Sequence, residues 1–280
     1  MNDEKNIGGG LIQTPADPRD FSFGAVFGLP QLSELPSMYK TSEPLGIKDQ
    51  GSSDLCTSFA LTAVSEDQEL TALAPEFQFA MTKKLQGEWQ SWGADLRNAC
   101  KSAVKVGSIP ESRLPQEFKL APDNSNRNFI ANWENWPSGI ELYATRHRKQ
   151  SYFSVNGPYS IFDNMRAVLW QNRHEERSIL TGIVWQAQWS GSDGYIKEDS
   201  GQPSFGHAIK VFGWKDDYLV AQLSNGTSMG EKGIFYFNKE VVNRQFTFGG
   251  YTFSDLPRVE AEYYISKDRT RPSSLFSRFL

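Results

Sequence analysis

The order of the local patterns restricts the possible folds of this 280-residue chain more than any other feature. Helical patterns come first, from Cys56 onward and again over residues 93–106. Runs of β-branched and aromatic residues, each bounded by turn formers, follow at 178–185, 207–214, 217–223 and 233–238. Helices followed by closely spaced strands, without the alternation of a parallel sheet, predict an α+β fold.

Two helix ends are marked by residues that satisfy backbone groups. Gly107 follows the pattern of residues 93–106 and is suited to end that helix, because glycine adopts the left-handed conformation of a C-terminal cap. Ser160 is suited to begin a third helix, with Asp163 at the third helical position.

The segments outside these patterns predict an irregular framework. Residues 1–35 are rich in Gly, Pro and Asp and predict an extended arm. The arm could lie along a cleft and regulate it, or pack on the back of the strand-rich half. Residues 110–150 predict an irregular crossing between the two halves, and residues 266–280 a mobile basic tail.

Composition argues against several classes of partner. The net charge of −4 and the pI near 5.5 do not favour nucleic acid or an anionic membrane. No apolar run approaches the roughly 20 residues of a spanning helix. The first residues lack the pattern of a signal peptide, and two cysteines make no disulfide framework. We therefore expect a cytoplasmic or otherwise intracellular protein, with association with a virion left open.

No metal-binding spacing of His and Cys occurs, so neither metal nor cofactor is expected.

Cys56 opens a predicted helix in the segment "IKDQGSSDLCTSFALTAV". A thiol at a helix N-terminus feels the positive end of the helix dipole, which favours the thiolate nucleophile. The Gln50 amide and the Cys56 backbone N–H could then form an oxyanion hole. The alternative is that Cys56 is a small buried side chain, as free cysteines often are.

His207 is the best placed of the three histidines, because it begins an apolar strand and directly follows Gly206. His147 lies in a basic patch and His174 in a polar turn. The other thiol, Cys100, falls on the apolar face of the second helix and is expected to be inert.

Three segments together resemble the papain-like cysteine peptidases. They are "DQGSSDLCTSFA", "GHAIKVFGW" and "LSNGTSMGEKGIFYF", in the order of that family's Cys, His and third catalytic segments. The resemblance implies two lobes with the active site in the cleft between them. It implies an arm over 1–35, a peptidase domain over 36–265 and a tail over 266–280. The helical lobe would cover about 50–135 and the β lobe about 136–265.

The resemblance also implies roles for single residues. Gln50 resembles the oxyanion-hole glutamine, Cys56 the nucleophile and His207 the general base and acid. "QSWGADLRNA" resembles the loop that pairs with an extended substrate, so Gly93 and Trp92 are expected to contact substrate. Gly206, beside His207, is expected to do the same.

The third segment departs from the family at the residue that orients the imidazole. Leu223 stands where the family has its catalytic Asn, and Asn225 stands where it has a shielding Trp. Side chains two apart on a strand share a face, so Asn225 could reach His207 in place of Leu223. Alternatively, Asn225 is a turn residue in "SNGT". Thr57 also replaces the aromatic residue that usually follows the Cys.

Two functions remain open at this stage. The first is a thiol peptidase that cleaves protein or peptide substrates through a Cys56 acyl-enzyme. The second is an inactive papain-like module that binds peptide or serves in an assembly. The changes at Leu223 and Asn225 support the second function, and retention of the Gln, Cys and His supports the first.

Overall fold

A computed structural model describes residues 9–14, 17, 20–41, 43–175, 177–198 and 205–255 of the chain. The α-helices are α1 (Phe23–Phe27), α2 (Cys56–Glu69), α3 (Pro75–Gln86), α4 (Leu96–Lys105), α5 (Arg127–Ala131), α6 (Glu141–Ala144), α7 (Ile161–Gln171) and α8 (Lys239–Gln245). The strands are β1 (Leu11–Ile12), β2 (Met38–Lys40), β3 (Ala94–Asp95), β4 (Lys149–Ser154), β5 (Ile179–Trp185), β6 (Tyr195–Ile196), β7 (Phe205–Lys215), β8 (Tyr218–Gln222), β9 (Ile234–Asn238) and β10 (Gly250–Asp255).

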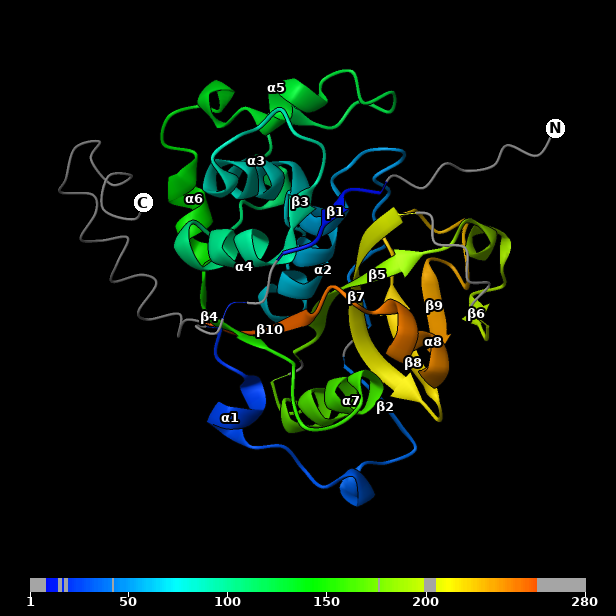
Figure 1. Ribbon diagram of the computed structural model, residues 1–280. Helices are drawn as coiled ribbons and strands as arrows, with labels where there is room; N and C mark the ends of the chain where they lie inside the picture. The colour runs from blue at the N-terminus through cyan, green and yellow to red at the C-terminus, as the bar shows by residue number, and fades with distance from the viewer. Residues whose placement is uncertain are drawn as a thin grey trace.

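The chain forms two structural parts, which meet where helix α2 packs against β7. Helices α2 to α6 gather on one side, and a strongly twisted sheet with α7 and α8 fills the other (Figure 1). The strands of this sheet follow the order β4-β10-β5-β7-β8-β9-β6, and β2 pairs with β7. Its pairings are antiparallel, except that β6 runs parallel to β9. The predicted α+β fold, with a helical lobe and an antiparallel β lobe, is thus confirmed.

The seam between the lobes is an apolar contact between α2 and β7. Cys56, Ala60 and Val64 of α2 belong to the same buried cluster as Ala208 of β7 and Leu180 of β5. The side chains that leave the sheet on its other face form a separate, larger core with α7 and α8. Because a strand alternates its side chains between two faces, β7 serves both cores at once.

The helix ends predicted at Gly107 and Ser160 are confirmed, whereas α4 begins at Leu96, three residues after the predicted start, with a cap at Asp95 that was not predicted. The Asp95 side chain caps α4 by accepting a hydrogen bond from the Asn98 backbone N–H at 2.9 Å. At the other end of α4, the backbone N–H of Gly107 donates to the Ser102 carbonyl at 3.0 Å. The Ser160 hydroxyl accepts from the Asp163 N–H at 3.2 Å at the start of α7.

The four predicted strand segments correspond to β5, β7, β8 and β9, with ends that differ by one or two residues. Strands β4 and β10 were not predicted, and neither was helix α3. β4 and β10 pair with each other at the edge of the sheet, so their formation depends on a partner distant in sequence. The expectation that residues 110–150 cross between the lobes is wrong over most of their length. Phe118, Ile130 and Trp136 pack in one cluster with Phe77 of α3 instead.

The N-terminal arm predicted over residues 1–35, of which the structure describes residues 9–14, 17 and 20–35, contacts both lobes, and helix α1 interrupts its predicted extended course. Strand β1 pairs in parallel with β3 of the helical lobe. The Phe21 carbonyl accepts from the Ser154 N–H of the β lobe at 2.9 Å. From there α1 and β2 continue along the β lobe (Figure 1). The tail predicted for residues 266–280 lies outside the described residues. None of the described helices has the length and hydropathy to cross a membrane.

Candidate active site

Cys56 is the first residue of α2, and its side chain is fully buried at the seam. Burial raises the pKa of the thiol above its usual value, because a thiolate loses the solvation of water. Backbone amides of Ala208 and Gly10 contact the sulfur and oppose this rise, and the negative charge of Asp54 adds to it. In this conformation the thiol is therefore held in its protonated form.

The N-terminal arm covers the thiol. The Gly10 amide contacts the Cys56 sulfur, and the Gly10 carbonyl accepts from the Ala94 N–H at 2.7 Å. A β-carbon at position 10 would collide with the Asp54 backbone, so only glycine allows this close approach. The arm thus passes directly over the candidate nucleophile as an extended peptide.

The Leu11 side chain holds the arm in place by packing into an apolar recess between the lobes, which we call the Leu11 seat. The side chain is 8% exposed and belongs to the cluster that contains Cys56 and Ala208. A β-carbon added to Gly182 would collide with the Leu11 side chain, so the absence of a side chain at Gly182 leaves the space that Leu11 fills. The Phe248 ring packs against the same cluster. Ile12, the next residue, points outward and is 39% exposed.

His207 lies at the start of β7, one residue before the backbone amide that contacts the Cys56 sulfur. Its ring is fully buried and faces two aromatic rings. The ring centroids of Trp185 and Phe205 lie 5.8 and 6.3 Å from that of His207. The fold therefore brings the predicted nucleophile and the backbone of the predicted base to the same seam.

Gln50 is held rigidly at the junction of the two lobes. Its side-chain N–H donates to the Ser53 carbonyl at 2.8 Å, and its side-chain oxygen accepts from the Ser224 hydroxyl at 2.5 Å. The Gln50 backbone N–H also donates to the Ser224 carbonyl at 2.8 Å. The turn that carries Gln50 leads directly into α2, so the glutamine and Cys56 share one short, fixed loop.

Leu223 and Asn225 occupy the positions beyond the end of β8. Leu223 is buried in the apolar core of the β lobe and supplies no hydrogen-bonding group there. Asn225 forms an isolated bridge with Asp49 and is 5% exposed. Its side-chain oxygen is buried, with no hydrogen-bond partner among the residues that the structure describes. A buried amide oxygen in this condition is a candidate acceptor for an imidazole N–H.

All three residues predicted to contact substrate lie against the arm. A β-carbon on Gly93, whose φ is +76°, would collide with the Gly10 carbonyl. The Trp92 indole is 58% exposed, and its N–H donates to the Gly9 carbonyl at 2.6 Å. A β-carbon on Gly206 would lie 2.6 Å from the Leu11 carbonyl oxygen. The positions expected to hold a substrate backbone here hold the arm's backbone.

A buried ion pair fixes the loop between Gln50 and Cys56. Both carboxylate oxygens of Asp54 accept from the Arg127 guanidinium, at 2.6 to 3.2 Å. The Asp54 carboxylate also accepts from the Gly93 backbone N–H at 2.5 Å. This network joins the loop before α2 to the loop before β3, which are the two walls that face the arm.

The remaining candidates lie elsewhere. Cys100 is buried in α4, and burial raises the pKa of its thiol well above the usual value. The His147 ring nitrogen Nδ1 lies 2.6 Å from the Glu69 carboxylate, and His174 is exposed in a turn. Within the described part of the chain, no cluster of His, Cys, Asp and Glu is suited to hold a metal ion.

Sequence reasoning missed Leu11, Gly182 and Ser224. A glycine inside a β-branched run was available as a signal at Gly182, since it often marks a close approach of another chain segment. Ser224 stands in the quoted third segment, but its contact with Gln50 depends on the pairing of segments 174 residues apart. Leu11 carries no local mark of its function.

No protein-family model and no curated protein matches the sequence. Among solved structures, the chain is similar to xylellain, a cysteine protease from Xylella fastidiosa, with a TM-score of 0.74 and 20% identity over 92% of this chain and 99% of that one. It is also similar to digestive procathepsin L2 of Tenebrio molitor, with a TM-score of 0.62 and 16% identity over 91% and 81% of the two chains. The protease and lectin-like domains of Cwp84 from Clostridium difficile give a TM-score of 0.62 at 14% identity over 91% and 57%.

These similarities assign the chain to the papain-like fold. The similarity to xylellain covers 92% of this chain and thus includes both lobes. The predicted fold class is confirmed by them.

Proposed function

We propose that this chain is a cysteine-type peptidase that its own N-terminal arm holds in a latent state. One observation supports this most: an extended polypeptide, the arm, runs across the Cys56 thiol and pairs with β3. The seam holds an extended backbone against a thiol at the start of a helix, and this arrangement has the shape that peptide cleavage requires. Proteases with this fold among the similar structures support the same reaction.

The reaction divides among three side chains. The Cys56 thiolate attacks the peptide carbonyl carbon, and the resulting oxyanion accepts from the Gln50 side-chain N–H and the Cys56 backbone N–H. His207 donates a proton to the departing amine, which leaves a Cys56 thioester. Water then attacks the thioester while His207 takes up its proton, and the acid product leaves the regenerated thiol.

The geometry of the arm explains why it is not itself a substrate. At Gly10 the N–H faces the sulfur, while the carbonyl oxygen accepts from the Ala94 N–H. A carbonyl held by Ala94 is not available to the Gln50 side chain, so the oxyanion would form without its stabilising donors. The arm therefore occupies the site of a substrate in an unproductive geometry.

Asn225 is assigned the role of orienting the His207 imidazole. Its buried side-chain oxygen has no hydrogen-bond partner among the described residues. An amide acceptor would hold the ring in the tautomer that takes a proton from the thiol. Asn225→Ala is expected to lower turnover at least about tenfold, which is about 1.4 kcal/mol in the barrier.

The test of activity uses full-length protein in which the arm is weakened by Leu11→Ala. Cleavage of an unfolded protein is measured for this variant and for the same variant carrying Cys56→Ala or Asn225→Ala. Cleavage should disappear with Cys56→Ala and fall with Asn225→Ala. Leu223→Asn in the Asn225→Ala background should leave turnover unchanged or raise it. Activity that survives Cys56→Ala would contradict the proposal.

A peptide-binding module without catalysis is the second candidate. The apolar Leu223 in the core and the protonated, buried thiol favour it. It predicts that the Leu11→Ala protein leaves unfolded proteins intact and that Cys56 reacts with iodoacetamide no faster than an ordinary cysteine. Fast alkylation of Cys56 together with cleavage supports the peptidase instead.

A further inference from the structure

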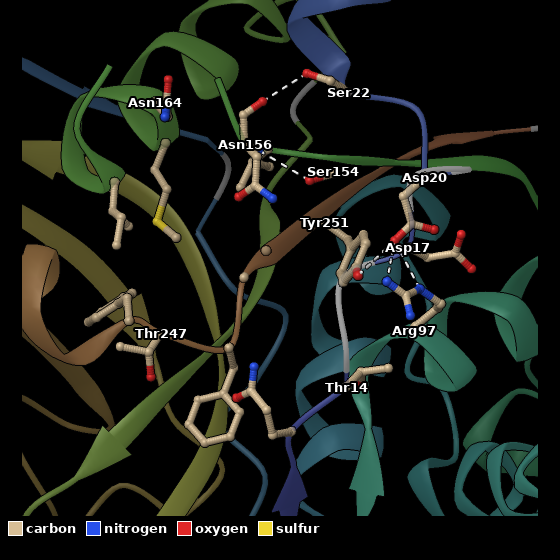
Figure 2. A pocket seen from close by; sticks show the side chains of 18 residues that line it. Thr14, Asp17, Asp20, Ser22, Arg97, Ser154, Asn156, Asn164, Thr247 and Tyr251 are labelled. Carbon is tan, nitrogen blue, oxygen red and sulfur yellow. Dashed lines mark hydrogen bonds and ion pairs between the residues drawn. The ribbon is translucent and has the colours of Figure 1, made fainter. Parts of the chain in front are cut away.

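A second feature of the arm lies beyond the thiol, at a cavity between the two lobes. The cavity has a volume of about 350 Å³ and is lined by both arm and body residues. Thr14 and Asp20 of the arm lie on the same side of it as Arg97 and Tyr251 of the body, and Asn156 and Thr247 lie on the opposite side (Figure 2). Phe248 lines the cavity and also borders the seat of Leu11, so the two spaces adjoin.

Three donors of the body converge on one carboxylate of the arm. The Arg97 guanidinium donates to the Asp20 oxygen Oδ2 through two nitrogens, at 2.7 and 2.9 Å. The Tyr251 hydroxyl donates to the same oxygen at 3.2 Å, and the Tyr152 hydroxyl to Oδ1 at 3.4 Å. Figure 2 shows Asp20, Arg97 and Tyr251 gathered at one end of the cavity.

These donors are built into rigid elements that do not belong to the arm. Arg97 lies in the first turn of α4, Tyr152 in β4 and Tyr251 in β10. The two tyrosine rings pack edge to face at 5.6 Å, and burial raises the pKa of both hydroxyls, which keeps them protonated. The Arg97 and Asp20 side chains are only 9% and 11% exposed. Withdrawal of Asp20 would therefore leave a largely buried cation without this partner, which is unfavourable.

We propose that Arg97, Tyr152 and Tyr251 form a carboxylate-binding subsite, which Asp20 of the arm now fills and which selects an acidic side chain in the polypeptide that replaces the arm. A planar guanidinium flanked by hydroxyl donors matches the geometry of a carboxylate. The position of the cavity beside the Leu11 seat places the subsite along the path of an extended chain. The inference has two halves. The binding half, that the subsite binds a carboxylate, stands alone. The selection half, that the subsite selects an acidic side chain in a substrate, rests on the proposed peptidase function.

The binding half is tested in the full-length chain by chemical rescue. Asp20→Ala removes the carboxylate that now fills the subsite, and sodium acetate is then compared with sodium chloride and with phosphate at equal ionic strength. Acetate should raise the thermal midpoint of Asp20→Ala by about 2 °C or more. It should leave wild type and Asp20→Ala/Arg97→Gln unchanged. A greater effect of phosphate than of acetate would contradict selection of a carboxylate.

A milder variant guards against misfolding of the arginine mutant. Asp20→Ala/Tyr251→Phe keeps the aromatic packing and removes one donor, so its acetate response should be smaller than that of Asp20→Ala. Equal acetate responses in Asp20→Ala, the arginine double mutant and the tyrosine double mutant would overturn the subsite.

The selection half is tested by the cleavage sites that each variant produces in an unfolded protein. All variants of this test also carry Leu11→Ala, which weakens the docking of the arm over Cys56. In that background, Asp20→Ala should cut with an excess of Asp or Glu at one fixed distance from the cleaved bond. Asp20→Ala/Arg97→Gln should lose this excess while cutting at other sites. Identical profiles would refute the selection. Absence of cleavage in both variants would refute the peptidase function and the selection with it, whereas the acetate response decides the subsite independently.

Discussion

Replacement of Leu11 by alanine tests whether the arm controls access to Cys56. The Leu11 side chain is 8% exposed against the Cys56 cluster, and its seat is formed where Gly182 has no side chain. The backbone of Gly182 on β5 cannot move into the space that a shortened residue 11 leaves. A buried Leu→Ala change costs about 2 to 5 kcal/mol, and here the loss falls on the docked arm.

The expected consequence is a large rise in the reactivity of Cys56. Each 1.4 kcal/mol changes an equilibrium about tenfold, so the lower limit of 2 kcal/mol increases the undocked fraction about 30-fold. When the arm redocks faster than the thiol reacts, the alkylation rate follows this fraction. The rate of Cys56 alkylation by iodoacetamide should therefore rise about 30-fold or more in Leu11→Ala.

The assay carries two controls within the same chain. Peptide-level mass spectrometry follows Cys56 and Cys100 together, and Cys100, buried in α4, should stay slow in every variant. Ile12→Ala removes a neighbouring side chain that is 39% exposed, so it should accelerate Cys56 only a few-fold. The reasoning is refuted if Leu11→Ala and Ile12→Ala react alike, or if Leu11→Ala reacts as slowly as wild type.

Three further outcomes follow from the buried groups. Gly10→Ala should also accelerate alkylation of Cys56, because its β-carbon collides with the Asp54 backbone; unchanged reactivity would show that the arm is held elsewhere. Asp54→Ala should lower the free energy of unfolding by about 3 to 5 kcal/mol in urea titration, because it leaves the Arg127 charge buried; a loss below about 1 kcal/mol would contradict this. Stability should fall above about pH 8.5, since unfolded thiols ionise there while burial raises the pKa of both folded thiols. Cys100→Ala should lose about 1.4 kcal/mol less than wild type between about pH 7.5 and about pH 9.5; equal losses would argue against the raised pKa of that thiol.

Much of the framework could be predicted because its signals are local. The predicted cap residues Gly107 and Ser160 act within one turn of the helix that each bounds. The strands β5, β7, β8 and β9 are short apolar runs between turn residues, which periodicity detects without a partner. Strands β4 and β10 and helix α3 were missed, because their signals are weaker and their stability comes from packing against distant elements.

The candidate site divides in the same way. The sequence by itself determined the chemical groups: the glutamine and thiol on one loop, the histidine at a strand start and the altered third segment. Tertiary structure alone decided that Ser224 holds Gln50 and that Leu223 is buried in the core. It also decided that the arm covers Cys56, because a Gly- and Pro-rich segment indicates where a chain can bend and not where it docks. Docking depends on the shape of a seat built from β3, β5 and β7, whose pieces meet only after folding.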